Sequence, residues 1–186
     1  MSTPAEILAL CRAVALRVWL HQLSPDYAET VARILFMTAA HESGGFKYRR
    51  QIGYTKWMLG GAWSLWQIEL PSIRDSVRRI DNSRALNTRV LGLCADFQCN
   101  SGVLVNAFTD DVRRLALLQY IATPEGDPLA CVLARLHYLV RPGRIPADPD
   151  GMAAYAKKHY NTDLGKATPG AYLAAFRKHW PEEAVA

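Results

Sequence analysis

Glu42 is the residue whose type and position point most directly to chemistry. It ends a stretch in which Ala28, Val31, Leu35 and Ala39 follow one another at helical spacing. At about 100° per residue, its side chain lies within about 40° of the Ala28 direction, toward the core. Burying an unpaired carboxylate costs several kcal/mol, so we expect Glu42 to hold a proton near neutral pH. Such a group can act as a general acid toward a glycosidic oxygen.

Two further segments carry residues that could complete a site around this acid. Ser64, Trp66 and Gln67 lie in GAWSLWQIE, and Tyr160 and Asn161 lie in YNTD nearer the C-terminus. Hydroxyl and amide groups can hydrogen-bond to a polar ligand. The cluster of Trp57, Trp63 and Trp66 is suited to packing against sugar rings, and packing into the core is an equally good interpretation.

The elements that must position these residues are mostly helices. Apolar residues repeat at helical spacing from Ile7 to Val18, after the N-cap signal Ser24-Pro25, from Val105 to Ala116, from Leu129 to Val140 and from Tyr172 to Trp180. Gly44 and Gly45 end the second of these helices.

The intervening segments predict loops within one domain. Residues 46–70 are rich in glycine and aromatic residues, which predicts a loop or small hairpin, and residues 141–151 form a Pro/Gly/Asp connector too short to separate two domains. We therefore expect an all-α fold, mainly helical with at most a small β-hairpin, formed as one domain by residues 1–186.

Composition excludes several classes of function. The net charge of +5 comes from scattered Lys and Arg residues, which by itself does not predict a nucleic-acid partner. No apolar run is long enough for a membrane span, and no signal peptide is expected at the N-terminus. The four cysteines are expected to be reduced. His41-Glu42 lacks the HExxH spacing because residue 45 is glycine, so we expect neither a metal nor a cofactor.

Glu42-Ser43 and the run from Ser64 to Ile68 resemble the goose-type lysozyme and soluble lytic transglycosylase families, within the lysozyme-like superfamily. In these families a catalytic Glu-Ser pair ends a helix and a Gly-Leu-Met-Gln-Ile-like segment follows. This chain has Ser64 in place of Gly and Trp66 in place of Met. The families' later Ala-Tyr-Asn-Ala-Gly segment corresponds either to residues 134–138, which include Tyr138, or to Tyr160-Asn161.

The resemblance implies a lysozyme-like fold and a set of site residues. Glu42 would be the catalytic acid, and the residues expected to bind substrate are Ser43, Ser64, Trp66, Gln67, Tyr138, Tyr160 and Asn161. The implied activity is cleavage of the β-1,4 bond between MurNAc and GlcNAc in peptidoglycan, with glycan strands as the partner. The order of segments after residue 134 also resembles cell-wall-degrading proteins of tailed-phage particles.

A second carboxylate would decide between the two reaction types. A hydrolase must position water or a nucleophile, whereas a lytic transglycosylase uses the C6 hydroxyl of the substrate itself. The candidates are Glu69, Asp75 and Asp81, of which Glu69 follows the Gln67-Ile68 pair directly and also occupies a structural position before Pro71. We therefore favour a transglycosylase, and hydrolysis stays open as the alternative.

The expected setting is a phage virion whose tail delivers the enzyme to the bacterial wall in the periplasm. A lysis enzyme that leaves through a holin pore would fit the sequence equally well. The alternative function is a non-catalytic structural protein of the virion or tail, with a lysozyme-like body that binds glycan or other virion proteins. Release of muropeptides by the purified chain separates the two functions.

Overall fold

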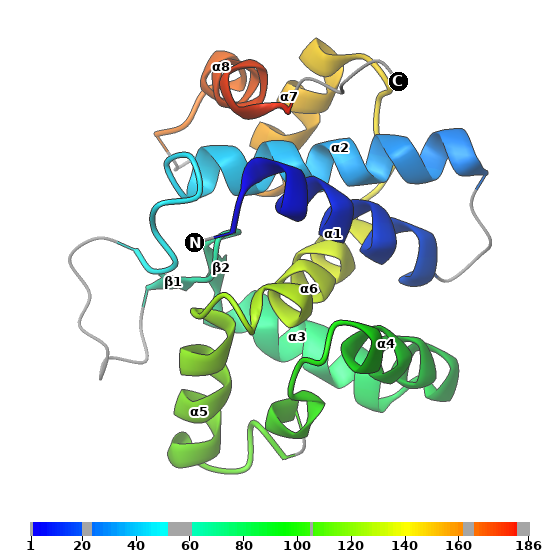
Figure 1. Cartoon of the computed structure of the whole chain (residues 1–186), viewed down its shortest axis with the longest axis vertical. Helices are drawn as coiled ribbons and strands as arrows, with labels where there is room; N and C mark the ends of the chain where they lie inside the picture. Colours follow the sequence, from blue (N-terminus) through cyan, green and yellow to red (C-terminus); the bar gives the residue numbers. More distant parts are fainter. Residues whose placement is uncertain (1, 20–23, 52–60, 105, 162–165, 182–186) are drawn as a thin grey trace.

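The computed structural model describes residues 2–19, 24–51, 61–104, 106–161 and 166–181. Figure 1 shows that these residues form a mainly helical molecule with one small antiparallel hairpin, which confirms the predicted mainly helical class. The elements are, in chain order, α1 (Pro4–Arg17), α2 (Pro25–Glu42), β1 (Ala62–Trp63), β2 (Ile68–Glu69), α3 (Leu70–Asp81), α4 (Arg84–Asp96), the 3-10 helix η1 (Ser101–Leu104), α5 (Asp111–Ile121), α6 (Asp127–Leu139), α7 (Pro149–His159) and α8 (Pro169–His179).

Helix α2 runs through the middle of the fold. Its first turn is capped by Ser24, whose side chain accepts a hydrogen bond from the backbone N–H of Tyr27, and Pro25 occupies the first helical position. Residues from Val31 to Ala40 are buried around nearly the whole circumference of the helix. A helix that is apolar on all sides must be covered on all sides, and α1 and α6 pack on it together with α7 and α8 (Figure 1).

The remaining helices form a second group that packs on α6. Helices α3 and α4 contact each other and α6, and α5 contacts α6 and η1. Figure 1 shows this group on the opposite side of α2 from α7 and α8. The C-terminal end of α6 reaches back toward the end of α7, because His137 in α6 hydrogen-bonds to the backbone carbonyl of His159 at 2.9 Å.

The hairpin is short and is held by pairing on both edges of β1. Ala62 pairs with Glu69, and Trp63 pairs with Ile68. On the other edge, Arg50 forms a bridge to Trp63. The described part of the glycine-rich and aromatic segment therefore agrees with the predicted loop or hairpin, while residues 52–60, including Trp57, lie outside the described residues.

Two predicted boundaries were wrong. The helix expected from Val105 begins instead at Asp111, because the side chain of Asp110 accepts a hydrogen bond from the N–H of Arg113 and caps the helix there. The connector expected over residues 141–151 ends earlier, since Asp148 caps α7 and Pro149 is its first residue.

Cys11, Cys94, Cys99 and Cys131 are all described, buried and free of disulfide bonds. Among the described residues, no helix combines the length and apolar character needed to cross a membrane.

Candidate active site

A groove of about 1150 Å³ opens where the ends of α2, α6 and α7 meet the hairpin. It draws its walls from segments that are far apart in the sequence. Its lining residues are Glu42, Tyr48, Arg50, Gln51, Ala62, Gln67, Ile68, Glu69, Ser72, His137, Arg141, His159, Tyr160, Asn161 and Lys166.

Glu42 enters this groove as the last residue of α2, and the helix end behind it is tightly fixed. The Oγ of Ser43 donates to the carbonyl of Ala39 at 2.6 Å and accepts the N–H of Phe46 at 2.6 Å. Gly45 then closes the helix by donating its N–H to the carbonyl of Ala40 at 2.8 Å, with a φ of +78°. Ser43 is fully buried and does not line the groove, so its place is behind the acid.

Two donors hold one oxygen of the Glu42 carboxyl group. The hydroxyl of Tyr172 in α8 donates to Oε1, and the amide Nδ2 of Asn161 donates to the same atom at 3.4 Å. Among the described residues Oε2 has no hydrogen-bond partner. With Oε1 accepting two hydrogen bonds, Oε2 is the oxygen of this half-buried side chain that is left to interact with a ligand in the groove.

The environment of Tyr172 keeps its hydroxyl protonated. Burial raises the pKa of Tyr172 far above its usual value, and the nearby negative charge of Glu42 raises it further. The imidazole of His41 lies against the Tyr172 ring, with centroids 4.0 Å apart, and burial lowers the pKa of His41. At neutral pH, therefore, the Tyr172 hydroxyl stays protonated and can donate its hydrogen bond to Glu42, and His41 is an uncharged ring packed against Tyr172.

Gln67 and Ser64 form the tight turn that carries the hairpin wall of the groove. Gln67 lines the groove, and its Nε2 donates to the carbonyl of Ser64 at 2.8 Å. Ser64 is buried with a φ of +71°, the left-handed conformation that favours glycine. The resembled families carry glycine at this position, and Ser64 uses its Oγ to accept the N–H of Trp66 at 3.2 Å.

The sugar-stacking interpretation of the tryptophans is wrong for Trp63 and Trp66. Both are fully buried, so no ligand can reach their faces. Trp66 instead donates its indole N–H to the carbonyl of Leu35 in α2 at 2.9 Å, and its own carbonyl accepts the Tyr160 hydroxyl at 2.8 Å. Trp66 therefore ties the hairpin to α2 and to the end of α7.

Of the two candidate tyrosine segments, the structure brings Tyr160-Asn161 to the acid. Asn161 contacts Glu42 directly and Tyr160 lines the groove. Tyr138 is buried behind Tyr160, with ring centroids 5.3 Å apart, and its hydroxyl lies 2.7 Å from the Oγ1 of Thr38. Tyr138 therefore supports the wall of the groove without lining it.

The three candidate second carboxylates lie in different places. Glu69 is exposed and lines the groove at the end of β2. Asp75 and Asp81 lie on α3 and do not line the groove. Among the described residues, Glu69 is thus the acidic residue that shares the groove with Glu42.

Several groove residues were not predicted from the sequence. Tyr48 is 48% exposed and lies on the wall, where it provides an accessible aromatic face. The cationic side chains of Arg50, Arg141 and Lys166 line the groove. Together with Glu42 and Glu69, these three cations leave the described lining of the groove with a net positive charge, which suits a substrate that carries carboxylates.

His137 lines the groove at a position that is largely shielded from solvent. Burial, together with a smaller contribution from the positive charge of Arg141, lowers the pKa of its imidazole to about 4. His137 is consequently neutral at pH 7. Among the described residues, no cluster of three or more His, Cys, Asp or Glu side chains is placed to hold a metal ion.

Comparisons with known proteins do not place the chain in a family. No family model matches it, and neither the curated proteins nor the solved structures include a significant match.

Proposed function

We propose that this chain cleaves the β-1,4 bond between MurNAc and GlcNAc in bacterial peptidoglycan, with Glu42 as the general acid. The observation that carries the proposal is the carboxyl group of Glu42 at the mouth of a large groove, with two donors on one oxygen and its other oxygen unpartnered among the described residues. The resemblance of Glu42-Ser43 and of the Ser64 to Ile68 run to lysozyme-like enzymes supports the same reading.

In the first step, Glu42 gives the proton on Oε2 to the glycosidic oxygen as the bond to the anomeric carbon breaks. Tyr172 and Asn161 keep their hydrogen bonds to Oε1 and stabilise the carboxylate that forms. The exposed ring of Tyr48 is placed to pack against sugar, and Tyr160 lines the groove beside it. Arg50, Arg141 and Lys166 are placed to attract the carboxylates that wall peptides carry.

Two second steps are compatible with this groove. In transglycosylation the C6 hydroxyl of the MurNAc sugar bonds to the anomeric carbon and returns its proton to Glu42, which leaves a 1,6-anhydro end. In hydrolysis a water molecule supplies the oxygen, and Glu69 is the groove carboxylate available to position it. We favour transglycosylation because Glu69 is exposed and the water-free route does not need it.

The test is the release of muropeptides from purified sacculi, analysed by mass spectrometry. Glu42→Gln keeps an acceptor for Tyr172 but has no acidic proton, so we expect a rate loss of about 100-fold or more. The matched variant Glu69→Gln should keep most of its activity and produce anhydro ends. Activity retained in Glu42→Gln contradicts the mechanism, and reducing ends that disappear in Glu69→Gln assign hydrolysis instead. A purified chain that folds and releases nothing favours the non-catalytic role.

We further propose that the enzyme is carried in a tailed-phage particle and acts on the wall from outside. The support is the resemblance of the segments after residue 134 to wall-degrading proteins of such particles. Mass spectrometry of purified particles should detect the chain at a fixed ratio to the tail proteins. Its absence from particles, with accumulation in lysing cells, would assign it to host lysis.

A further inference from the structure

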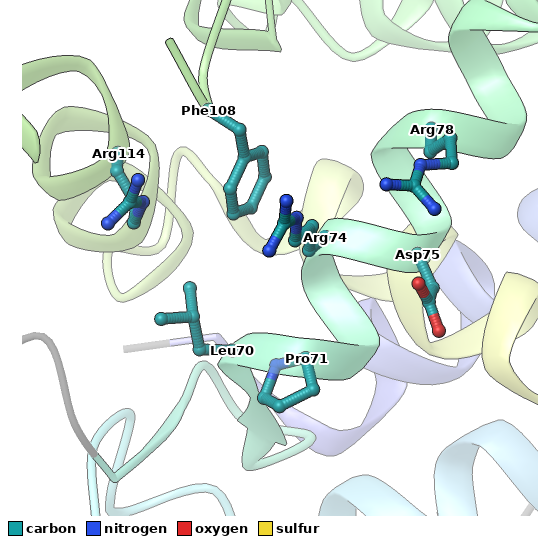
Figure 2. Close-up of a pocket in the computed structure, with 7 residues that line it drawn as sticks. All are labelled: Leu70, Pro71, Arg74, Asp75, Arg78, Phe108 and Arg114. Atoms are coloured by element: carbon teal, nitrogen blue, oxygen red, sulfur yellow. The ribbon is translucent and has the colours of Figure 1, made fainter. Parts of the chain in front are cut away.

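A second hollow of about 430 Å³ lies beside the proposed active site and is built from α3 and α5. The first turn of α3 contributes to both hollows, because Ser72 lines the groove while Leu70 and Pro71 line the second hollow. We call this second hollow the arginine pocket. Its lining residues, drawn in Figure 2, are Leu70, Pro71, Arg74, Asp75, Arg78, Phe108 and Arg114.

The lining of the arginine pocket carries a net positive charge. It contains three arginines and one carboxylate, and in Figure 2 the carboxylate of Asp75 points away from Phe108. Within the part of the chain that the structure describes, Arg74 and Arg78 have no ion pair or hydrogen bond from their side chains. Both are exposed, so their donors are available to a ligand.

Arg114 is the third cation and is more firmly held. Its Nη1 pairs with Asp111 at 2.6 Å, and its guanidinium carbon lies 5.7 Å from the centroid of the Phe108 ring. Its Nε is buried without a hydrogen-bond partner in the structure. Arg114 therefore adds a positive charge to the pocket, and its contacts with Asp111 and Phe108 hold that charge in place.

The pocket also has an apolar part. Phe108 is partly buried and lies between Arg114 and Arg74 in the view of Figure 2, and Leu70 and Pro71 line the lower part of the pocket in the same view. Guanidinium groups recognise carboxylates through paired N–H donors, and an apolar surface between them favours methyl groups over bare inorganic ions. The volume lies in the range of small-ligand sites, which is roughly 300–1000 Å³.

We propose that the arginine pocket binds the acidic stem peptide of peptidoglycan through its carboxylates. This inference rests on the proposed function, because a glycan strand in the groove carries its peptide on the MurNAc sugar next to the shared turn of α3. Arg74 and Arg78 bind the carboxylates, and the surface formed by Leu70, Pro71 and Phe108 packs against the alanine methyl groups.

The test is a calorimetric titration of the full chain with the synthetic dipeptide L-alanyl-D-glutamate, which carries two free carboxylates. We expect saturable binding that weakens at least tenfold in Arg74→Gln/Arg78→Gln. The matched control is Arg79→Gln/Arg84→Gln, which removes the same charge from two exposed arginines outside both hollows and should bind as the parent does. The diamide of the dipeptide should not bind.

Three results would overturn the inference: equal affinity in both double variants, binding of the diamide as strong as that of the dicarboxylate, or binding of inorganic phosphate as strong as that of the dipeptide. The last would define a general anion site. Because the titration breaks no bond, its failure leaves the role of Glu42 untouched. Conversely, a chain that binds the dipeptide but releases no muropeptides would contradict the proposed function alone.

Discussion

The two oxygens of the Glu42 carboxyl group are inequivalent. Oε1 accepts hydrogen bonds from Tyr172 and Asn161, whereas Oε2 has no partner within the described residues. This asymmetry restricts the rotation of the carboxyl group. A general acid must present its proton within hydrogen-bond distance of the leaving oxygen, so under the proposed function the donors on Oε1 would position the acid.

Tyr172→Phe tests this positioning at the scale of one residue. It removes the hydroxyl donor and keeps the ring that packs on His41. A hydrogen bond to a charged group contributes about 1.5–3 kcal/mol, so kcat should fall about 10- to 100-fold while KM changes little. Kinetics on soluble glycan fragments measure the two constants separately. Tyr120→Phe, which lies outside the groove, is the matched control, and an equal loss in both variants would argue for a merely structural effect.

The sequence revealed part of this site. Glu42, Gln67 and Asn161 stand in local motifs, and all three line the groove. Tyr172 could not be predicted as a partner of Glu42, because it lies 130 residues away and its own segment indicates only a helix stripe. The burial of Trp66 could not be predicted from the sequence either, because an indole ring is suited both to packing against sugar and to packing in the core.

At the scale of elements, the end of α2 determines where Glu42 points. Gly45 closes the helix with a φ of +78°, and a Cβ atom placed there would lie 2.5 Å from Nε2 of His179. The turn therefore relies on glycine for its conformation and for the close approach of α8. Gly143 has a similar φ of +80° with open space around its Cβ position.

This pair of glycines gives a controlled comparison. Gly143→Ala should lower the free energy of unfolding by about 1 kcal/mol through backbone strain alone. Gly45→Ala should lower it further and also reduce kcat, since His179 and the helix end must shift. Urea unfolding and muropeptide release measure the two effects. Identical losses in both variants would mean that contact with His179 is of no consequence.

The contact between α6 and α7 makes stability depend on pH. His137 donates to the His159 carbonyl, and burial lowers its pKa to about 4 from an unfolded value near 6.5. Below about pH 6.5 the unfolded chain binds a proton that the folded chain does not, so this histidine lowers the free energy of unfolding as pH falls from 7 to 4. The full effect is about 3 kcal/mol.

His137→Gln should therefore show a shallower loss of stability between pH 7 and pH 4 than the parent chain. His179→Gln is the control, because His179 lies outside this contact at the end of α8. Unfolding titrations at several pH values measure both slopes. If the parent and His137→Gln lose stability in parallel, the buried neutral imidazole is not the cause.

The helices were predictable where apolar spacing and caps agreed, as in α1, α2, α6 and α8. Helix α3 was not predicted, although Ile73, Val77 and Ile80 follow helical spacing, because its first turn merges with the hairpin segment. The start of α5 was misplaced because apolar spacing continues through Phe108, whereas the Asp110 cap sets the boundary.

At the scale of the whole molecule, a buried ion pair joins segments that are far apart. Arg49 contacts both carboxylate oxygens of Asp127, at 3.2 and 2.7 Å, and Ser2 donates to Asp127 at 2.9 Å. The side chains are 12% and 3% exposed, so each charge depends on the other. Burial still raises the pKa of Asp127, and Arg49 offsets part of that effect.

Arg49→Met should destabilise the fold by about 3–5 kcal/mol, because it leaves the Asp127 charge buried and unpaired. The double variant Arg49→Met/Asp127→Leu should recover much of this loss, since neither buried charge remains. Thermal and denaturant unfolding of the two variants measure the difference. An Arg49→Met variant as stable as the parent would place this pair among the weak surface ion pairs, such as Arg12 with Glu29.

The general class of fold followed from the sequence because periodicity is a local property. The assembly of the groove did not, since it depends on which helix ends converge, and that is decided by packing around α2.

The hydrogen bond between Glu42 and Tyr172 joins an early helix to the last one. During translation α2 can form long before α8 leaves the ribosome, so a nascent chain presents the acid without the donor that orients it. Under the proposed function, the chain would become active in wall cleavage only after Tyr172 has been synthesised and has reached Glu42.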